Sequence, residues 1–344
     1  MRVAVTADPE IPVPPLLYGG AERVVETLVC GLKARGHSVT LFANAASQVP
    51  CELVPYAGAG SVSWSDTLKN MRLVARTVEH GGFDVVHSFG RLAYLLQLLP
   101  RRIPKIMSYG RWVSARSVIL GNILSRGSLR FTSCSRFMIE KVKGLGAWSV
   151  IYHGIPLDRY TFCPAVAADA PLIYLGRIEP LKGAHLAIEA ARISGRRLII
   201  AGNVEKEHMG YFKRAVEPHL GDRVRYVGPV DDRQKSGLLG EALAFLMPVL
   251  WKEPFGLVMA EALACGTPVI AFRNGGSPPE IVEDGMNGFL CDDARGMAEC
   301  ARKAGMIDRA GCRRSAEARF SEGAMVGAYE KLYTELVWRS KKSA

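Results

Sequence analysis

The chain of 344 residues lacks several patterns that would assign it to common classes of protein. Its eight cysteines form no C-x-x-C pair and no short metal-like spacing, so neither a zinc site nor a redox pair is predicted. No segment approaches the ~18 uninterrupted apolar residues of a membrane span. The first residues predict a strand and not a secretion signal, so we expect a cytoplasmic protein with reduced cysteines.

Two ligand-binding patterns are also missing. No G-x-G-x-x-G turn is present, which argues against a nicotinamide-dependent oxidoreductase. No D-x-D motif occurs, only the adjacent pairs Asp231-Asp232 and Asp292-Asp293, so a catalytic metal is not expected. The predicted chemistry therefore includes no cofactor and no metal.

Acidic residues are fewer than basic ones, and the net charge is +11. This excess favours anionic partners such as nucleotide-sugars, phosphorylated acceptors or an anionic membrane face. A solvated basic surface explains the charge equally well. The basic residues are scattered and accompany no nucleic-acid-binding motif, so nucleic acid is not an expected partner.

Short apolar runs alternate with helical patterns along the whole chain. Leu198-Ile199-Ile200-Ala201 and Ala244-Phe245-Leu246-Met247 suit strands that are buried on both faces of a parallel sheet. The alternation predicts two doubly wound α/β domains, with the boundary in the proline-marked stretch 160–171. Strands are expected at 2–7, 38–43, 84–89, 105–109, 131–135, 149–153, 171–175, 197–201, 224–228, 243–248, 267–272 and 288–291.

Residues 253–261 combine a loop, a proline and a helix-forming run. Proline suits the first helical position, so the helix is predicted to begin at about Pro254. Its first free N–H groups carry partial positive charge and suit a phosphate or diphosphate. We expect these groups around Phe255, Gly256 and Leu257.

Two glutamates bracket this helix start. Glu261 lies two turns into the helix and could accept hydrogen bonds from the ribose of a nucleotide whose diphosphate sits on the helix end. Glu253 lies on the other side of the phosphate and could accept from a sugar. Taken alone, the two residues could equally be solvated charges on an ordinary loop and helix.

Two cations follow the expected strand 171–175. Arg177 and Lys182 are five residues apart, and together they can flank one diphosphate. The guanidinium can bind two oxygens at once, whereas the ammonium acts as a point charge. The alternative is that both belong to an ordinary charged surface.

The first domain offers two further candidate segments. Gly19 and Gly20 lie at a strand-to-helix turn, where the backbone can approach an anion or simply make a tight turn. His87 lies near the end of a buried strand, where open α/β sheets bind ligands. It is as well explained as a structural histidine as it is as a catalytic one.

The order of motifs in the second half carries a family resemblance. After the E-x7-E pair come the strand segment Cys-Gly-Thr-Pro-Val-Ile-Ala-Phe (265–272), the loop Asn-Gly-Gly-Ser-Pro-Pro-Glu-Ile (274–281) and the turn Asp-Gly-Met-Asn-Gly-Phe-Leu (284–290). This set resembles glycosyltransferase family 4, retaining enzymes of the GT-B fold. The resemblance implies two Rossmann-like doubly wound parallel-sheet domains facing across a cleft.

The same resemblance implies roles for particular residues. Glu253, Arg177, Lys182 and His87 are the catalytic candidates. Many family members read H-x-H where this chain has His87 and Phe89, so any histidine-assisted step is in doubt. The donor would be held by Gly19, Gly20, Gly176, Arg177, Lys182, Gly202, Asn203, Gly228, Val230, Glu253, Phe255, Gly256, Leu257, Val258 and Glu261.

The expected function is that of a metal-independent, retaining glycosyltransferase. The expected donor is a UDP-sugar in the first place, and a GDP- or ADP-sugar in the second. The acceptor would be a saccharide, a natural product or a lipid-linked molecule. Peripheral contact with an anionic membrane is compatible with the charge. The alternatives are a nucleotide-sugar-binding protein without transfer activity and, with less support, an oxidoreductase.

The resemblance also suggests how the chain divides. The acceptor domain would comprise residues 1–163 and the donor domain residues 164–320. A final helix at about 321–340 would cross back onto the first domain.

The missing D-x-D motif yields a first prediction. Transfer activity should persist in a chelator, because two cations take the place of a metal's charge at the diphosphate. The measurement is donor turnover with and without the chelator. Activity that is abolished by the chelator and restored by magnesium or manganese would contradict it.

Overall fold

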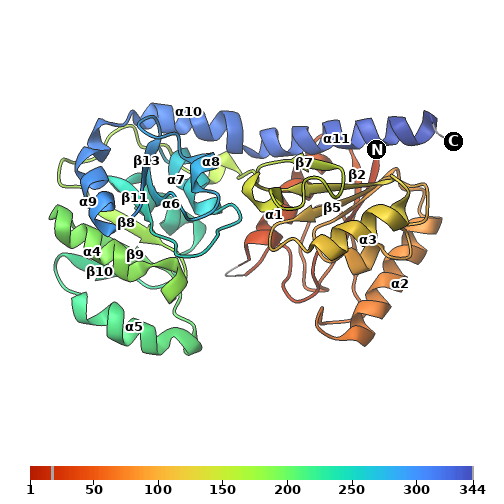
Figure 1. The fold of residues 1–344 in the computed structure, drawn as a ribbon, viewed down its shortest axis with the longest axis horizontal. Coiled ribbons are helices and arrows are strands. Elements are labelled where there is room, and N and C mark those ends of the chain that lie inside the picture. Colours follow the sequence, from red (N-terminus) through yellow and green to blue (C-terminus); the bar gives the residue numbers. More distant parts are fainter. Residues whose placement is uncertain (17–18, 343–344) are drawn as a thin grey trace. The chain divides into compact units, whose positions relative to one another are not determined.

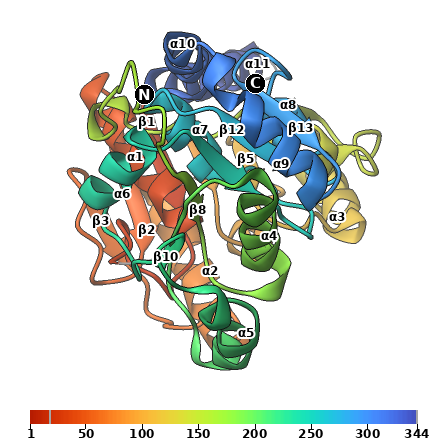
Figure 2. The same ribbon diagram turned by 90° about the vertical axis from the view of Figure 1, so that its left-hand side faces the viewer.

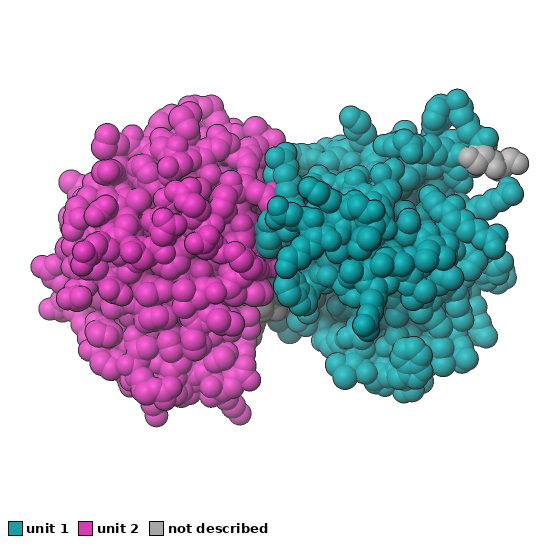
Figure 3. Space-filling model, in the orientation of Figure 1, with its two compact units in different colours: residues 1–154, 322–344 teal, residues 155–321 magenta. Residues whose placement is uncertain are grey.

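The computed structural model describes residues 1–16 and 19–342, which form two compact α/β units. Unit 1 comprises Met1–Gly154 and the chain from Glu322 onward, and unit 2 comprises Ile155–Ser321 (Figures 1 and 3). Each unit is built on one sheet of parallel strands with helices between them. This is the doubly wound α/β architecture that the alternating pattern predicts.

Unit 1 contains a seven-stranded sheet in the order β3-β2-β1-β4-β5-β6-β7. Its strands are β1 (Arg2–Thr6), β2 (Ser38–Ala43), β3 (Glu52–Pro55), β4 (Val85–Ser88), β5 (Lys105–Tyr109), β6 (Leu129–Ser133) and β7 (Trp148–Val150). The helices are α1 (Gly20–Ala34), α2 (Trp64–His80), α3 (Ala115–Ser125) and α11 (Glu322–Lys342), with 3-10 turns η1 (Leu92–Leu95) and η2 (Phe137–Ile139). The short strand β3 was not predicted, because it lies at the sheet edge and is too exposed to show an apolar run.

Unit 2 contains a six-stranded sheet in the order β10-β9-β8-β11-β12-β13. Its strands are β8 (Leu172–Leu175), β9 (Leu198–Ala201), β10 (Val224–Tyr226), β11 (Ala244–Met247), β12 (Val269–Phe272) and β13 (Gly288–Cys291). The helices are α4 (Ala184–Ser194), α5 (Met209–Ala215), α6 (Asp232–Gly240), α7 (Leu257–Ala264), α8 (Pro278–Ile281), α9 (Ala294–Lys303) and α10 (Arg309–Phe320). The 3-10 turns are η3 (Leu157–Arg159), η4 (Pro180–Lys182), η5 (Lys206–His208), η6 (Glu217–His219) and η7 (Ala304–Met306). Helices α4 and α9 pack against each other (Figure 2).

The segment 155–163 belongs to unit 2, whereas the predicted boundary between the domains was at 163/164. Its backbone is tied to unit 2 at two points. The N–H of Thr161 donates to Ser236 Oγ (3.0 Å), and the N–H of Cys163 donates to the carbonyl oxygen of Cys265 (3.0 Å). The pattern of prolines and alanines in the sequence contains no sign of these long-range bonds.

Helix α11 returns to unit 1 and packs on α1. A Cβ atom at Gly31 would lie 2.5 Å from Val326 Cγ2, so the absence of a side chain at Gly31 lets the two helices approach. Glu330 of α11 accepts hydrogen bonds from Arg35 Nη1 (2.8 Å) and pairs with His37 Nε2 (2.8 Å). One face of α11 is buried in unit 1, and its side chains are Met325, Val326, Tyr329, Leu332, Tyr333 and Leu336.

One buried arginine, Arg309, connects three segments of unit 2 through its hydrogen bonds. Arg309 Nη1 donates to the carbonyl oxygen of Ala242 (2.9 Å), and Nη2 donates to that of Gly240 (2.7 Å). Arg309 also donates to the Cys163 carbonyl (2.7 Å) and to Thr267 Oγ1 (3.0 Å). These bonds connect the end of α6, the 155–163 segment and the start of β12.

We predict that Arg309→Met lowers the free energy of unfolding by roughly 2–5 kcal/mol, because buried acceptors lose their donor. Arg314→Met is the control, since Arg314 is 67% exposed and its pair with Asp308 is worth roughly 0–1 kcal/mol. Urea denaturation followed by circular dichroism measures both variants. Equal losses in the two variants would show that the buried bonds do not stabilise unit 2 as proposed.

Candidate active site

The loop between β8 and α4 carries Arg177 and Lys182. Gly176 follows β8 directly, so the loop starts at the carboxyl edge of the sheet. Gly183 has φ +75°, and a Cβ atom there would lie 2.1 Å from the carbonyl oxygen of Pro248. Only glycine therefore lets the loop pass this close to the chain after β11 and turn into α4.

Arg177 is surrounded by carboxylates. Its Nη2 lies 3.2 Å from Glu179 Oε1, and its Nη1 lies 3.7 Å from Glu205 Oε1. The hydroxyl of Tyr174 donates to the Arg177 carbonyl oxygen (3.0 Å), which orients the backbone of the loop. The guanidinium is thus balanced by local acids, and its side chain stays partly exposed.

Lys182 forms a close ion pair with Glu253. The Nζ atom lies 2.5 Å from Glu253 Oε2 and 4.6 Å from the centre of the Trp251 ring. The indole N–H of Trp251 donates to the same carboxylate oxygen (3.0 Å). The structure therefore brings together two candidates that lie 71 positions apart in the sequence.

The backbone of Glu253 is held by the glycine-rich loop 274–277. Its N–H donates to the Gly275 carbonyl oxygen (2.7 Å), and its carbonyl accepts from the N–H of Ser277 (3.0 Å). Gly276 has φ +96°, and a Cβ atom there would lie 2.7 Å from the Glu253 carbonyl oxygen. The loop thus fixes the position of Glu253.

Helix α7 begins at Leu257, three residues later than predicted. Gly256 has a left-handed φ of +77°, which breaks the helical path between Pro254 and Leu257. Phe255 is buried and packs against Phe320, with 5.8 Å between ring centres. Leu257 and Val258 lie in the first turn and are partly exposed, so a ligand at this end of α7 would meet Gly256, Leu257 and Val258 first.

Glu261 is buried in α7 and has two strong partners. The Tyr160 hydroxyl and Lys235 Nζ both donate to its Oε1 atom at 2.8 Å. Lys235 also lies 3.1 Å from Asp232 Oδ1. The carboxylate therefore joins α7 to α6 and to the 155–163 segment. No pattern in the sequence predicts this structural role.

The remaining donor candidates line the carboxyl ends of β8, β9 and β10. Gly202 has φ +146°, and a Cβ atom there would lie 1.9 Å from the Gly176 carbonyl oxygen. Asn203 accepts from the N–H of Ile178 through its backbone carbonyl (2.9 Å). Gly228 has φ +78° and accepts from the N–H of Gly202 (2.8 Å), and the partly buried Val230 follows two residues later. These loops lie close together through backbone contacts at one sheet edge.

His87 in unit 1 lies in a fully buried polar cluster. Its Nδ1 is 2.6 Å from the Tyr333 hydroxyl of α11, and its Nε2 is 2.6 Å from Ser108 Oγ. Burial lowers the pKa of His87 from 6.5 to about 3, so the ring is neutral at neutral pH. This environment favours the structural alternative. Phe89, at the position of the second family histidine, packs on the His87 ring with 4.2 Å between centres.

The carboxyl edge of β1 holds an acid that the sequence analysis does not select. Asp8 lies two residues after β1, and within the described part of the chain its buried Oδ1 atom has no hydrogen-bond partner. Burial raises its pKa from 3.8 to about 6, and the charges of Arg111 and Arg91 oppose that rise. Gly19 caps α1 nearby, and a Cβ atom there would lie 2.7 Å from Glu22 Oε2. Gly20 is the first residue of α1. A polar residue just past a central parallel strand is the signal that could have identified Asp8.

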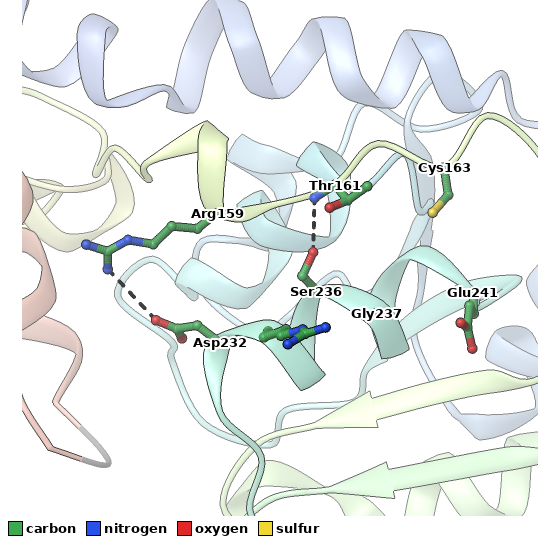
Figure 4. Close-up of a pocket in the computed structure, with 8 residues that line it drawn as sticks. Arg159, Thr161, Cys163, Asp232, Ser236, Gly237 and Glu241 are labelled. Atoms are coloured by element: carbon green, nitrogen blue, oxygen red, sulfur yellow. Dashed lines mark hydrogen bonds and ion pairs between the residues drawn. The ribbon is translucent and has the colours of Figure 1, made fainter.

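A cavity of about 480 Å³ in unit 2 lies between the 155–163 segment and α6 (Figure 4). Arg159 and Asp232 pair there at 3.8 Å. None of the predicted donor residues lines the cavity, which adjoins α6 on the side of Asp232 and Ser236.

Only one group of residues within 1–16 and 19–342 has side chains spaced to hold a metal ion: Glu205, Glu207 and His208. His208 Nε2 lies 3.3 Å from both Glu179 Oε2 and Glu207 Oε1, and Glu205 pairs with Arg177. Ion pairs within the protein account for this group, which is largely open to solvent.

Two family models match the chain. One, described as Glycosyl transferases group 1, matches residues 167–304, and one described as Glycosyltransferase Family 4 matches residues 18–159. Together they span most of both units. The chain belongs to the glycosyltransferases of the GT-B fold, of family 4 type.

The names of individual relatives refer to different molecules. Glycogen synthase of Mycobacterium tuberculosis is 32% identical over 235 residues, covering 64% of this chain and 54% of that protein, so this chain spans about half its length. Phosphatidyl-myo-inositol mannosyltransferase of Mycobacterium leprae is 26% identical over 282 residues, 74% of each protein. The solved structure of AviGT4, a glycosyltransferase involved in avilamycin A biosynthesis, matches over 98% of both chains with a TM-score of 0.72 and 26% identity.

The raised pKa of Asp8 predicts a pH-dependent contribution to stability. The folded state holds this proton more tightly than the unfolded state, whose carboxyl has its ordinary pKa of 3.8. The contribution is fully present below that value and is lost as the pH rises through about 6. Asp8→Asn removes the titration, so it should be more stable than the parent at about pH 8, by up to about 3 kcal/mol, with the gap shrinking toward pH ~4. Urea denaturation at both pH values measures the gap, and a gap that does not vary with pH would contradict the assignment.

Proposed function

We propose that this chain transfers a sugar from a nucleoside-diphosphate donor to an acceptor with retention of the anomeric configuration. A UDP-sugar is the first choice of donor, and GDP- and ADP-sugars are the others. The printed names of the relatives concern glycogen, a phosphatidylinositol and avilamycin. They support a saccharide, a lipid-linked molecule or a natural product as the acceptor class.

The observation that carries the proposal is the contact of Lys182 with Glu253 (2.5 Å) at the carboxyl edge of the unit 2 sheet. The two opposite charges are largely shielded from solvent, so they stabilise each other, and each becomes costly when its partner leaves. A diphosphate can take the place of Glu253 on Lys182. Glu253 would then accept hydrogen bonds from the hydroxyls of the transferred sugar. Donor binding would thus exchange one ion pair for two ligand contacts.

Arg177 would complete the diphosphate site. Its guanidinium already has carboxylate partners in Glu179 and Glu205, so its side chain is oriented before a donor binds. The positive charges of Arg177 and Lys182 would stabilise the leaving nucleoside diphosphate, where negative charge develops as the glycosidic bond breaks. The start of α7 at Gly256 and Leu257 would add backbone N–H groups.

The reaction proposed for this site is a front-face substitution. The bond from the anomeric carbon to the phosphate oxygen breaks, and the bond to the acceptor oxygen forms on the same face. The departing phosphate oxygen takes the acceptor proton. No protein base is required in this route, which agrees with the buried and neutral His87.

Glu261 would hold the ribose of the donor. Both of its hydrogen bonds within unit 2 are accepted by Oε1, so Oε2 is the atom that a ribose hydroxyl would reach. Lys235 and Tyr160 would fix the carboxylate for that role. This part of the donor does not change during transfer.

Two parts of the proposal concern the setting. A cytoplasmic location is proposed, with peripheral contact at an anionic membrane. The structure of residues 1–16 and 19–342 contains no helix that is both long and apolar enough to span a bilayer. The second candidate function is nucleotide-sugar binding without transfer, which shares the donor site.

A donor panel tests the proposal directly. A nucleotide-sugar at 100 times its dissociation constant adds about 2.7 kcal/mol to stability, which a thermal-shift assay detects. Donor hydrolysis then separates an enzyme from a binding protein. Absence of stabilisation by any nucleotide-sugar would contradict the proposal, and binding without hydrolysis or transfer would favour the second candidate.

Substitutions of Glu253 and Glu261 should have different effects on kinetics and nucleotide binding. Glu253→Gln should lower kcat, because a charge near the sugar matters most in the transition state. It should not weaken the binding of free nucleoside diphosphate, because the diphosphate no longer has to displace Glu253 from Lys182. Glu261→Gln should raise the donor KM and should weaken the binding of free nucleotide by a similar factor. Each effect should be about ten- to a hundredfold, the value of a charge-assisted hydrogen bond of roughly 1.5–3 kcal/mol.

Steady-state kinetics and calorimetry with the free nucleotide measure the two effects. Because Glu261 pairs with Lys235, circular dichroism must first show that Glu261→Gln is folded. Glu317→Gln is a control on the exposed side of α10. Loss of nucleotide binding in Glu253→Gln with normal binding in Glu261→Gln would reverse the proposed roles.

A further inference from the structure

Helix α3 of unit 1 is oriented with its large apolar residues outward. The residues that pack inward are Val118, Gly121 and Ser125. A Cβ atom at Gly121 would lie 3.0 Å from Leu129 and 3.3 Å from Phe131, so the helix lies close to β6. The outward side chains are Ile119 (42% exposed), Leu120 (48%), Ile123 (68%) and Leu124 (38%).

A further large apolar residue, Trp112, is 91% exposed and lies three residues before the helix starts. Single exposed apolar residues are common on protein surfaces, whereas a contiguous group marks an interaction site. The four aliphatic side chains occupy two successive turns of one helix. We call Trp112 and these four residues the α3 face.

The surroundings of the α3 face carry positive charge. From residue 85 to residue 139 the sequence has no acidic residue and nine basic ones. Arg111, Arg116 and Arg126 are exposed at the two ends of the helix. Arg111 interacts with the carboxyls of Asp8 and Glu22, whereas Arg116 and Arg126 form no ion pair within the described part of the chain. Charge of one sign therefore flanks the apolar group on both sides.

A second basic group adjoins the end of α3. Ser128 Oγ donates to the Arg101 carbonyl oxygen (3.3 Å), and Ser340 Oγ of α11 donates to that of Arg102 (3.3 Å). The last turn of α11, which carries Arg339, Lys341 and Lys342, is thereby joined to the 101–102 turn. Arg101 itself pairs with Glu79 at 2.8 Å. The positive charge at this end of α3 thus comes from segments far apart in the sequence.

We propose that the α3 face binds the surface of an anionic phospholipid bilayer. Aliphatic side chains and a tryptophan enter the boundary between headgroups and acyl chains, and flanking arginines contact lipid phosphates. A second copy of the chain is disfavoured as the occupant, because a two-fold contact would place the same arginines opposite one another. An acidic protein partner would match the charge as well, and it is an outcome that the vesicle test separates, because such a partner gives no reason for the protein to bind lipid.

Such binding would place the bilayer beside the carboxyl edge of the unit 1 sheet. Arg111 lies two residues after the end of β5, and α3 starts four residues further on. Burial raises the pKa values of Asp8 and Glu22, and the charge of Arg111 opposes both rises, so Arg111 lies near these acids. If the proposed glycosyl transfer holds, this arrangement favours a lipid-linked acceptor over a soluble one.

The test is binding of the full chain to vesicles, with no donor present. Vesicles of equal parts phosphatidylcholine and phosphatidylglycerol should bind the protein at low salt, and phosphatidylcholine alone should bind it far more weakly. Ile123→Ser with Leu124→Ser, and separately Arg116→Gln with Arg126→Gln, should each lower the partition coefficient on the order of tenfold. Val62→Ser and Arg225→Gln with Arg295→Gln are the matched controls, because these exposed residues lie outside the α3 face and should bind as the parent does.

Tryptophan fluorescence locates the contact. Emission should shift to shorter wavelength on anionic vesicles, and Trp112→Phe should remove that shift whereas Trp64→Phe, at another exposed tryptophan of unit 1, should keep it. Failure of the parent to bind anionic vesicles, or unchanged binding by both α3 double variants, would overturn the proposal. A dimer in sedimentation velocity that Ile123→Ser with Leu124→Ser dissociates would also overturn it and assign the face to a second copy. Donor hydrolysis should be unchanged in every variant, so failure here is distinct from failure of the proposed reaction.

Discussion

The ion pair between Lys182 and Glu253 is the interaction on which the candidate site of unit 2 depends. Neither charge is well solvated, so each needs the other until a ligand supplies a replacement. The surrounding loops serve to hold the pair. Gly183 lets the loop between β8 and α4, which carries Lys182, pass close to the chain after β11. The loop 274–277 fixes the backbone of Glu253. These glycines are therefore required by backbone proximity, whether or not they also touch a donor.

A similar arrangement recurs deeper in unit 2. Glu261 accepts hydrogen bonds from Lys235 and Tyr160. Arg309 donates hydrogen bonds to four oxygen atoms in three segments of the chain. Buried charges of this kind fix geometry, since they tolerate little displacement of their partners. The elements that present the ribose, phosphate and sugar contacts in the proposed donor site are thus tied to one another. A substitution at Glu261 would therefore weaken the connection of α7 to α6, in addition to any effect on the proposed donor site.

Unit 1 shows how a motif residue can take a structural role. His87 lies at the strand position that the family resemblance selects, yet its ring nitrogens meet Ser108 and the Tyr333 hydroxyl, 246 positions away in the sequence. Phe89 packs on the same ring, so the departure from H-x-H replaces a polar side chain with an apolar neighbour. Asp8 follows the neighbouring strand β1, and burial raises the pKa of its half-buried carboxyl. At this edge of the unit 1 sheet the imidazole is therefore enclosed by protein groups, whereas the Oδ1 atom of Asp8 has no hydrogen-bond partner within the described residues.

The sequence by itself determined the features that depend on local patterns. Alternating apolar periods predicted the two parallel-sheet units and twelve of their strands, because strand and helix periodicity follows from backbone geometry. The order of motifs predicted the family, and the short spacing of Arg177 and Lys182 placed them on one loop. Tertiary structure decided the rest. The helix begins at Leu257 because Gly256 turns left-handed, and Glu253 meets Lys182 across 71 residues because two loops converge at one sheet edge. Periodicity specifies which side of an element is apolar, but only packing decides which charges meet and which apolar residues are left outside.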